Sequence, residues 1–172
     1  LALNAKLLEA ADPGNPLKPL VTILPACRDT RPNPDGNCAI VDFKILSQDI
    51  AAGTGSLYVN WEDTEQGGDF DQDMKGLLRY AITGGTITIT TDVNAQSTPF
   101  ELGFGYVIGG TTEDGFHVQS GINGFIFDEA GTAIDCAAGC ASGDAPVART
   151  YTLGASGAKL LNDPLWYAAK YG

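Results

Sequence analysis

The part of this 172-residue chain with the clearest potential for chemistry is the stretch WEDTEQGGDFDQDM, residues 61–74. It contains no basic residue and six carboxylates: Glu62, Asp63, Glu65, Asp69, Asp71 and Asp73. Like charges this close together repel one another, so their repulsion must be offset. A bound cation, a pair of catalytic carboxyl groups with unequal pKa values, or simple hydration of an exposed loop would each offset it.

Calcium is the cation that suits such a loop. It takes six to eight oxygen ligands, and carboxylates at alternate positions of a sharply bent loop supply them. The pattern D-x-D-x-D, which follows the glycine pair at 67–68, provides both the alternation and the bend. Two acidic residues at the end of the preceding run are placed to complete the cage. We therefore predict a calcium site with the ligands Asp69, Asp71, Asp73, Glu62 and Asp63.

The acidic stretch is not an EF-hand. Met74 stands where the EF-hand loop has its glycine, and Tyr80 stands where it has its bidentate glutamate. The residues that follow are also typical of a strand rather than a helix. The prediction is a calcium-binding loop between two strands, and a hydrated acidic loop remains the open alternative.

Catalysis is not expected from this sequence. A glycosidase uses two carboxyl groups, but any acidic loop contains such a pair, so the composition alone is a weak indication. His117 alternates with Phe116 and Val118, as a strand residue does. Ser120 is not part of the G-x-S-x-G elbow that serine hydrolases use. We expect no catalytic residue and no enzymatic activity.

The four cysteines form two local pairs, Cys27 with Cys38 and Cys136 with Cys140. Each pair brackets a loop rich in small and turn-forming residues, and this locality favours the disulfides 27–38 and 136–140 over the two other possible pairings. Zinc and free thiols are the alternatives, but neither pair has the C-x-x-C spacing typical of zinc ligands. Disulfides predict an oxidising compartment and hence an exported protein.

Charge and hydropathy exclude several functional classes. The 10 basic and 21 acidic residues give a net charge of −11, which disfavours binding to nucleic acid or to anionic lipid. Mean hydropathy is near zero, and no apolar run approaches the roughly 20 residues that span a bilayer. We expect a globular domain without a membrane span, whose natural ligands are cations or basic partners.

Alternating apolar and polar residues predict short antiparallel strands over most of the chain. The runs 39–48 and 56–62 alternate, and two hairpins are expected over 77–92 and 103–121. The first hairpin turns at Gly84-Gly85, with its threonines on the solvent-exposed face of the sheet and its isoleucines on the core face. Two further short strands are expected at 122–128 and 148–154. The predicted fold is mainly β, an antiparallel β-sandwich or a compact barrel.

A short helix is expected at each end of the β-rich part. Leucines at helical spacing indicate a helical lead-in over residues 1–16, which belongs either to this module or to a preceding domain. At the other end, Asp163 is a good N-cap before Pro164, which predicts a short helix over 162–172 leading into a next domain. The disulfide-stapled β-rich module then covers residues 17–161.

Aromatic residues are frequent in the predicted strands, and most fall on the inward phase. We expect them to form the core; the other reading is a platform for sugars. The residues concerned are Trp61, Phe70, Tyr80, Phe104, Tyr106, Phe125 and Phe127. A calcium-dependent carbohydrate-binding module is therefore the alternative function.

Several stretches resemble one known family. WEDTEQGGDFDQDMKGLLRY, FGYVIGGTTEDGFHVQSG, VTILPACRDT, CAIVDFKILSQ and LNDPLWYAAKYG are similar to the PilC/PilY family, and the likeness covers nearly the whole chain. These are large exported proteins associated with the tips of bacterial type IV pili. In that family this stretch lies between a von Willebrand factor A-like domain and a C-terminal β-propeller.

The resemblance implies a function and a setting. It implies a structural and interaction module of an adhesin that acts in pilus biogenesis and surface attachment, located at the bacterial cell surface, the pilus tip or the outer membrane. The implied partners are neighbouring domains of the same chain, minor pilins at the pilus tip, and a host or abiotic surface. The chain begins without Met, so we expect it to be a segment of a longer protein.

Overall fold

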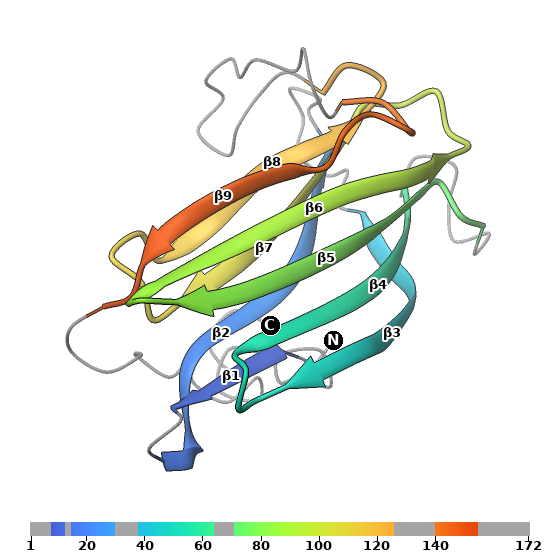
Figure 1. Cartoon of the computed structure of the whole chain (residues 1–172). Coiled ribbons are helices and arrows are strands. Elements are labelled where there is room, and N and C mark those ends of the chain that lie inside the picture. The colour runs from blue at the N-terminus through green and yellow to red at the C-terminus, as the bar shows by residue number, and fades with distance from the viewer. Residues whose placement is uncertain (1–7, 13–14, 30–37, 64–70, 126–139, 155–172) are drawn as a thin grey trace, which may run out of the picture.

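Antiparallel strands form all the regular structure in the part of the chain that the computed structural model describes (Figure 1). The described residues are 8–12, 15–29, 38–63, 71–125 and 140–154. These ranges contain no helix long and apolar enough to cross a membrane.

Five strands form the larger sheet, in the order β3-β4-β5-β6-β9. They are β3 (Ala39–Asp49), β4 (Thr54–Glu62), β5 (Met74–Thr83), β6 (Thr86–Gln96) and β9 (Val147–Thr152). Every neighbouring pair is antiparallel. The apolar and polar residues that alternate in the sequence point to opposite faces of the sheet. Along β6, Ile87 and Ile89 are buried and the threonines beside them are partly exposed, as expected.

Four strands form the second sheet, in the order β1-β2-β7-β8, which lies behind the larger sheet in Figure 1. They are β1 (Leu8–Asp12), β2 (Asn15–Asp29), β7 (Leu102–Gly109) and β8 (Gly115–Ile122). All three pairings are antiparallel. The chain therefore enters this sheet, crosses to the larger sheet for four strands, returns for β7 and β8, and crosses again to β9.

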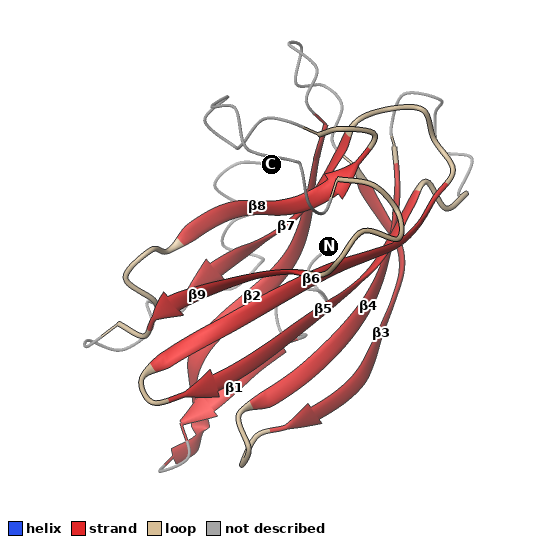
Figure 2. Ribbon diagram, turned by 45° about the horizontal axis from the view of Figure 1, so that its top comes forward, coloured by secondary structure: helices blue, strands red, loops and turns tan. Residues whose placement is uncertain are grey.

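The two sheets pack face to face over a single main apolar core (Figure 2). Trp61 of β4 meets Phe104 of β7 edge to face, with ring centroids 4.4 Å apart, so the largest side chain of the core joins the two sheets. Of the two architectures expected from the sequence, the structure is the β-sandwich. Its largest fully buried side chains also include Tyr106, Tyr151, Phe125, Ile23, Leu57, Met74 and Leu78.

A polar bridge closes the sandwich beside β8 and β9. The side-chain amide of Gln119 on β8 donates to the carbonyl oxygens of Ile89 (2.9 Å) and Val147 (2.6 Å), both in the opposite sheet. The same side chain accepts a hydrogen bond from the hydroxyl of Tyr106, which also bonds to the hydroxyl of Tyr151 at 2.7 Å. These bonds satisfy polar groups that the packing of the sheets would otherwise leave buried and unpaired.

Both expected hairpins are present. The turn between β5 and β6 consists of Gly84 (φ 58°) and Gly85 (φ 87°), a left-handed backbone that glycine adopts without steric cost. The second hairpin joins β7 to β8 through residues 110–114, where Asp114 Oδ1 accepts a hydrogen bond from Thr111 N at 2.7 Å. Local turn chemistry therefore fixes the register of both strand pairs.

The structure corrects two expectations about secondary structure. Residues 8–12 of the expected helical lead-in (1–16) form strand β1, because Leu8 pairs with Ile23 of β2 and tertiary pairing overrides local helical spacing. Residues 123–125 form a turn after β8 rather than the beginning of a strand, and Asn123 has a positive φ of 57°. The expected helix over 162–172 lies outside the described residues.

Candidate functional site

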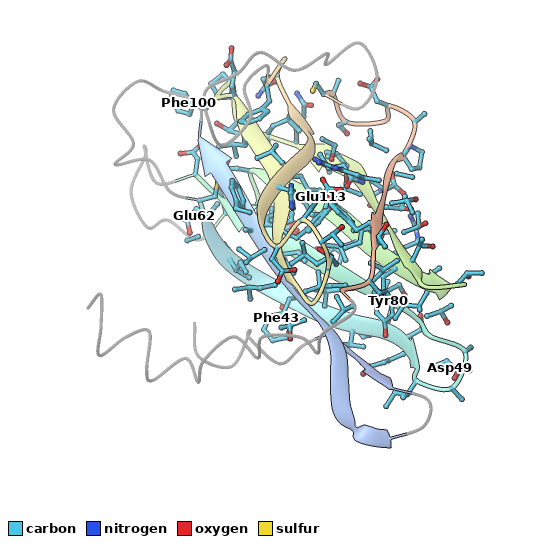
Figure 3. The ribbon with its side chains drawn as sticks, turned by 90° about the vertical axis from the view of Figure 1, so that its left-hand side faces the viewer. Phe43, Asp49, Glu62, Tyr80, Phe100 and Glu113 are labelled. Atoms are coloured by element: carbon cyan, nitrogen blue, oxygen red, sulfur yellow. A yellow bond between two sulfur atoms is a disulfide. The ribbon has the colours of Figure 1, made fainter. Side chains whose placement is uncertain are left out.

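The acidic stretch lies where β4 ends and β5 begins. Trp61 pairs with Met74 across the two strands, and Asp73 N donates to Trp61 O at 3.0 Å. Because these strands are antiparallel neighbours, carboxylates from the two ends of the connecting loop must meet at one end of the sheet. Glu62, labelled in Figure 3, marks this end, opposite the β3–β4 turn near which Asp49 lies.

Two of these carboxyl groups belong to one buried hydrogen-bond network. Asp73 Oδ2 accepts from the backbone N–H of Asp63 at 2.7 Å, and the hydroxyl of Thr98 donates to Asp63 Oδ2 at 2.6 Å. The backbone N–H of Ser97 donates to the carbonyl of Asp73 at 3.0 Å. Asp63 and Asp73 are only 2% and 6% exposed, so these bonds replace the water that both groups give up on folding.

The electrostatics of this cluster raise the pKa of Asp73 from 3.8 to about 6. Burial is the largest cause, since a desolvated carboxylate is costly. The hydrogen bond from Asp63 N stabilises the ionised form and lowers the pKa, whereas the negative charges of Asp63 and Asp71 and a hydrogen bond with Asp71 raise it. The acidic residues that the sequence placed together therefore do repel one another in the fold.

The structure gathers only part of the expected ligand set. Glu62 is 3% exposed and Asp63 and Asp73 are buried, Asp71 is exposed, and Asp69 lies outside the described residues. Within the described ranges, no three His, Cys, Asp or Glu side chains converge as a metal site requires. The calcium site with these five ligands stays a prediction.

Thr98 and Ser97 are the partners that sequence reasoning missed. They lie in the connection between β6 and β7, more than twenty residues after the acidic stretch, and they reach it only through the fold. Ser97 also donates its hydroxyl to the carbonyl of Gln72 at 2.5 Å. The sequence offered one weak indication, a pair of hydroxyl residues immediately after a strand.

The first expected disulfide is present. Cys27 and Cys38 are bonded, with their Cα atoms 5.4 Å apart, and the bond ties the end of β2 to the start of β3 and thus one sheet to the other. Cys140 also forms a disulfide. Cys136 lies outside the described residues, so the pairing 136–140 stays a prediction.

His117 and Ser120 make separate structural contacts. His117 Nε2 lies 2.7 Å from the carbonyl oxygen of Glu113, and the hydroxyl of Ser120 bonds to that of Thr91 in the opposite sheet at 2.7 Å. His117 and Ser120 thus have different hydrogen-bond partners and do not form a shared site.

The aromatic side chains lie in the core, as the sequence predicted. Those in the described ranges have exposed fractions of 3% or less: Trp61, Tyr80, Phe104, Tyr106 and Phe125. Phe70 and Phe127 lie outside these ranges. These five aromatics are therefore unavailable as a surface platform for sugars.

The fold and its contacts define a class of protein: a disulfide-linked antiparallel β-sandwich module held by one apolar core. The family model described as "PilY1 homolog, beta-sandwich" matches residues 39–148, which is more than half of the chain. The chain belongs to the PilY1 family.

A curated relative agrees with this assignment. The chain is 32% identical over 141 residues to the type IV pilus biogenesis factor PilY1 homolog of Xylella fastidiosa (strain Temecula1). The alignment covers 66% of this chain but only 10% of the relative, so the chain spans about a tenth of that protein's length. No solved structure matches the chain.

Proposed function

We propose that this chain is a non-enzymatic structural and interaction module of an exported protein that acts in type IV pilus biogenesis and surface attachment. The observation that carries the proposal is the match of a PilY1 β-sandwich family to residues 39–148, together with the similarity to a relative named as a type IV pilus biogenesis factor. A rigid sandwich tied by a disulfide suits a module that holds neighbouring parts of a long chain in place.

The setting follows from the same observations. The Cys27–Cys38 disulfide supports an oxidising compartment, and the family supports a place at the cell surface or pilus tip. Its partners in this proposal are adjacent domains of the parent chain, minor pilins, and the surface to which the cell attaches. Binding at a strongly acidic module favours basic partners.

Deletion of the module from the parent protein tests this proposal. In the bacterium that makes the protein, the segment is replaced by a flexible linker, and sheared surface pilin and attachment of cells are measured together. We expect both to fall. Normal piliation with reduced attachment would restrict the role to adhesion, and no change in either would refute the proposal.

Calcium stabilisation is a second part of the proposal. Two observations support it: the mutual repulsion of Asp63, Asp71 and Asp73, which a cation would relieve, and the side chain of Asn60. Asn60 is 1% exposed, lies two residues before Glu62 on β4, and its Oδ1 has no hydrogen-bond partner within the described part of the chain. Amide and carboxylate oxygens are the ligands that calcium prefers.

Melting curves with calcium and with a chelator test this part separately. A cation present at a free concentration of 100 times its dissociation constant stabilises the fold by about 2.7 kcal/mol, so the melting temperature should rise by several degrees. Asp71→Asn should abolish most of that rise, because the cation loses a charged ligand. No rise and no binding heat would leave the loop as a hydrated acidic turn.

A further inference from the structure

The outer face of the larger sheet, which faces the viewer in Figure 1, carries a shallow pocket of about 370 Å³. The adjacent strands β3, β4, β5 and β6 all contribute to it. Most of its lining consists of residues with hydroxyl or guanidinium groups: Ser47, Thr54, Ser56, Arg79, Thr88 and Thr90.

The shape of the pocket follows from the sizes of the side chains on adjacent strands. Ala81 of β5 pairs with Thr54 of β4 on one side and with Thr88 of β6 on the other. Its side chain is a single methyl group, which leaves a hollow between the two threonines. Arg79, two residues earlier on the same face of β5, forms a higher wall.

Three of the hydroxyl groups that line the pocket bond to another hydroxyl group. Ser47 Oγ lies 2.7 Å from Ser56 Oγ, and Thr88 Oγ1 lies 2.8 Å from Thr150 Oγ1 on β9. A hydroxyl has one donor and two acceptor positions, so each pair keeps one donor and several acceptors for a third group. The pocket therefore presents both donors and acceptors, and three of its hydroxyl groups are oriented by a hydroxyl partner.

The charge of the pocket is nearly balanced. Arg79 Nη1 lies 3.1 Å from Asp92 Oδ2, and the arginine side chain is 43% exposed. A guanidinium has five N–H donors, and the bond from Nη1 to Asp92 uses one of them, so Arg79, which lines the pocket, keeps further donors. The chain as a whole carries a net charge of −11, which repels polyanionic ligands.

We propose that this pocket binds one or two units of a neutral carbohydrate without the help of a cation. Sugar hydroxyl groups both donate and accept hydrogen bonds, as the hydroxyl groups of the pocket do. The guanidinium of Arg79 adds N–H donors that can bond to an uncharged sugar oxygen. The volume lies at the lower end of the range for ligand pockets, about 300–1,000 Å³, which fits a small saccharide rather than a large ligand. This binding activity goes beyond the structural role proposed above.

The proposed site is separate from the acidic cluster. The pocket is also lined by Tyr80, which lies with Asp49 toward the end of the sheet opposite Glu62 (Figure 3). Carbohydrate binding at the pocket and calcium binding at the acidic loop can therefore be measured independently of each other.

NMR titration of the isotope-labelled chain tests the proposal. The probes are cellobiose, mannobiose and N,N′-diacetylchitobiose, each added up to near its solubility limit, with digalacturonate as the anionic comparison. We expect at least one neutral disaccharide to shift the amide signals of Ser56, Arg79 and Thr88, equally with and without EDTA. No shift with any neutral probe, or shifts confined to the acidic cluster, would overturn the proposal.

Matched variants locate the binding. Ala81→Leu fills the hollow and should remove binding, and Arg79→Gln should weaken it roughly tenfold by removing charged donors. Arg149→Gln is the control, because Arg149 is 44% exposed and also forms a surface ion pair, with Glu113 at 3.0 Å, but does not line the pocket. If both pocket variants bind as the unchanged chain does while their amide spectra remain those of a folded protein, the site is elsewhere and the proposal fails.

Discussion

At the scale of single residues, Asp73 illustrates how the fold changes the chemistry of a carboxyl group. Its pKa is raised to about 6, mainly by burial and further by the charges of Asp63 and Asp71. In the unfolded chain the same group titrates near 3.8. The folded chain therefore holds a proton more tightly than the unfolded chain does between these two values.

The first prediction concerns the pH dependence of stability. Because the folded state binds the extra proton, the contribution of Asp73 to stability should be greatest below about pH 4 and should be lost as the pH rises through 6. Asp73→Asn cannot ionise and still accepts a hydrogen bond from Asp63 N, so its stability should change less over this range. At pH 7 we expect its melting temperature to be higher than that of the unchanged chain by about 3 °C.

Urea unfolding at a series of pH values in the presence of a chelator measures this effect. Asp42→Asn, at an exposed position on β3, is the control and should leave the profile as it is. A profile for Asp73→Asn that declines as steeply as that of the unchanged chain would show that another group causes the decline.

Close backbone approaches are a residue-scale feature that the sequence did not reveal. A Cβ at Gly105 would lie 2.2 Å from the carbonyl oxygen of His117, and a Cβ at Gly76 would lie 2.5 Å from the ring of Phe104. These glycines allow strands and sheets to come together. The Gly84-Gly85 turn, by contrast, could be predicted from the sequence, because its role depends on neighbours in the chain and not on the other sheet.

At the scale of elements, the sequence predicted the strands whose pattern is local. β4, β5 and β6 alternate along their lengths, and β5 and β6 are joined by a turn of two residues. The helix expected around Leu8 was wrong. The leucine spacing there is helical, but Leu8 pairs with Ile23, which lies fifteen residues away on β2, and local spacing does not reveal that pairing. Contact between sheets, including the bonds made by Gln119, could not be predicted without the topology.

The second prediction concerns that bridge. Gln119→Leu removes the donors to Ile89 O and Val147 O and the acceptor for the hydroxyl of Tyr106, and it adds no replacement. Because buried polar groups lose their partners, the free energy of unfolding should fall by about 1–3 kcal/mol.

Denaturant unfolding of Gln119→Leu checks this value. Gln96→Leu is the comparison, since Gln96 is exposed at the end of β6 and bonds to Asn123 and to Ser142 N in loops. We expect the loss at Gln119 to exceed the loss at Gln96. Equal losses would mean that the bridge does not hold the sheets together.

At the scale of the whole molecule, a disulfide and an apolar core hold the module. The Cys27–Cys38 bond joins β2 to β3, which belong to different sheets. Cysteine spacing was enough to predict this bond, because the two residues are close in sequence. The same reasoning could not say which sheets the bond would connect.

The third prediction is the contribution of this bond to stability. Closing a loop of this length is expected to stabilise the fold by about 3 kcal/mol, so replacing Cys27 and Cys38 with alanine should lower the free energy of unfolding by that amount. Unfolding in urea without reductant measures it. A double variant as stable as the unchanged chain would show that the core alone maintains the junction between the sheets.

The proposed function requires a folded PilY1-family β-sandwich at this place in the parent protein. The most direct measurement is the amount of sheared surface pilin in bacteria whose parent protein carries, in place of this segment, either the matching segment of the Xylella fastidiosa relative or a flexible linker of equal reach. We expect the relative's segment to restore piliation and the linker to leave it impaired. Full piliation with the linker would contradict it.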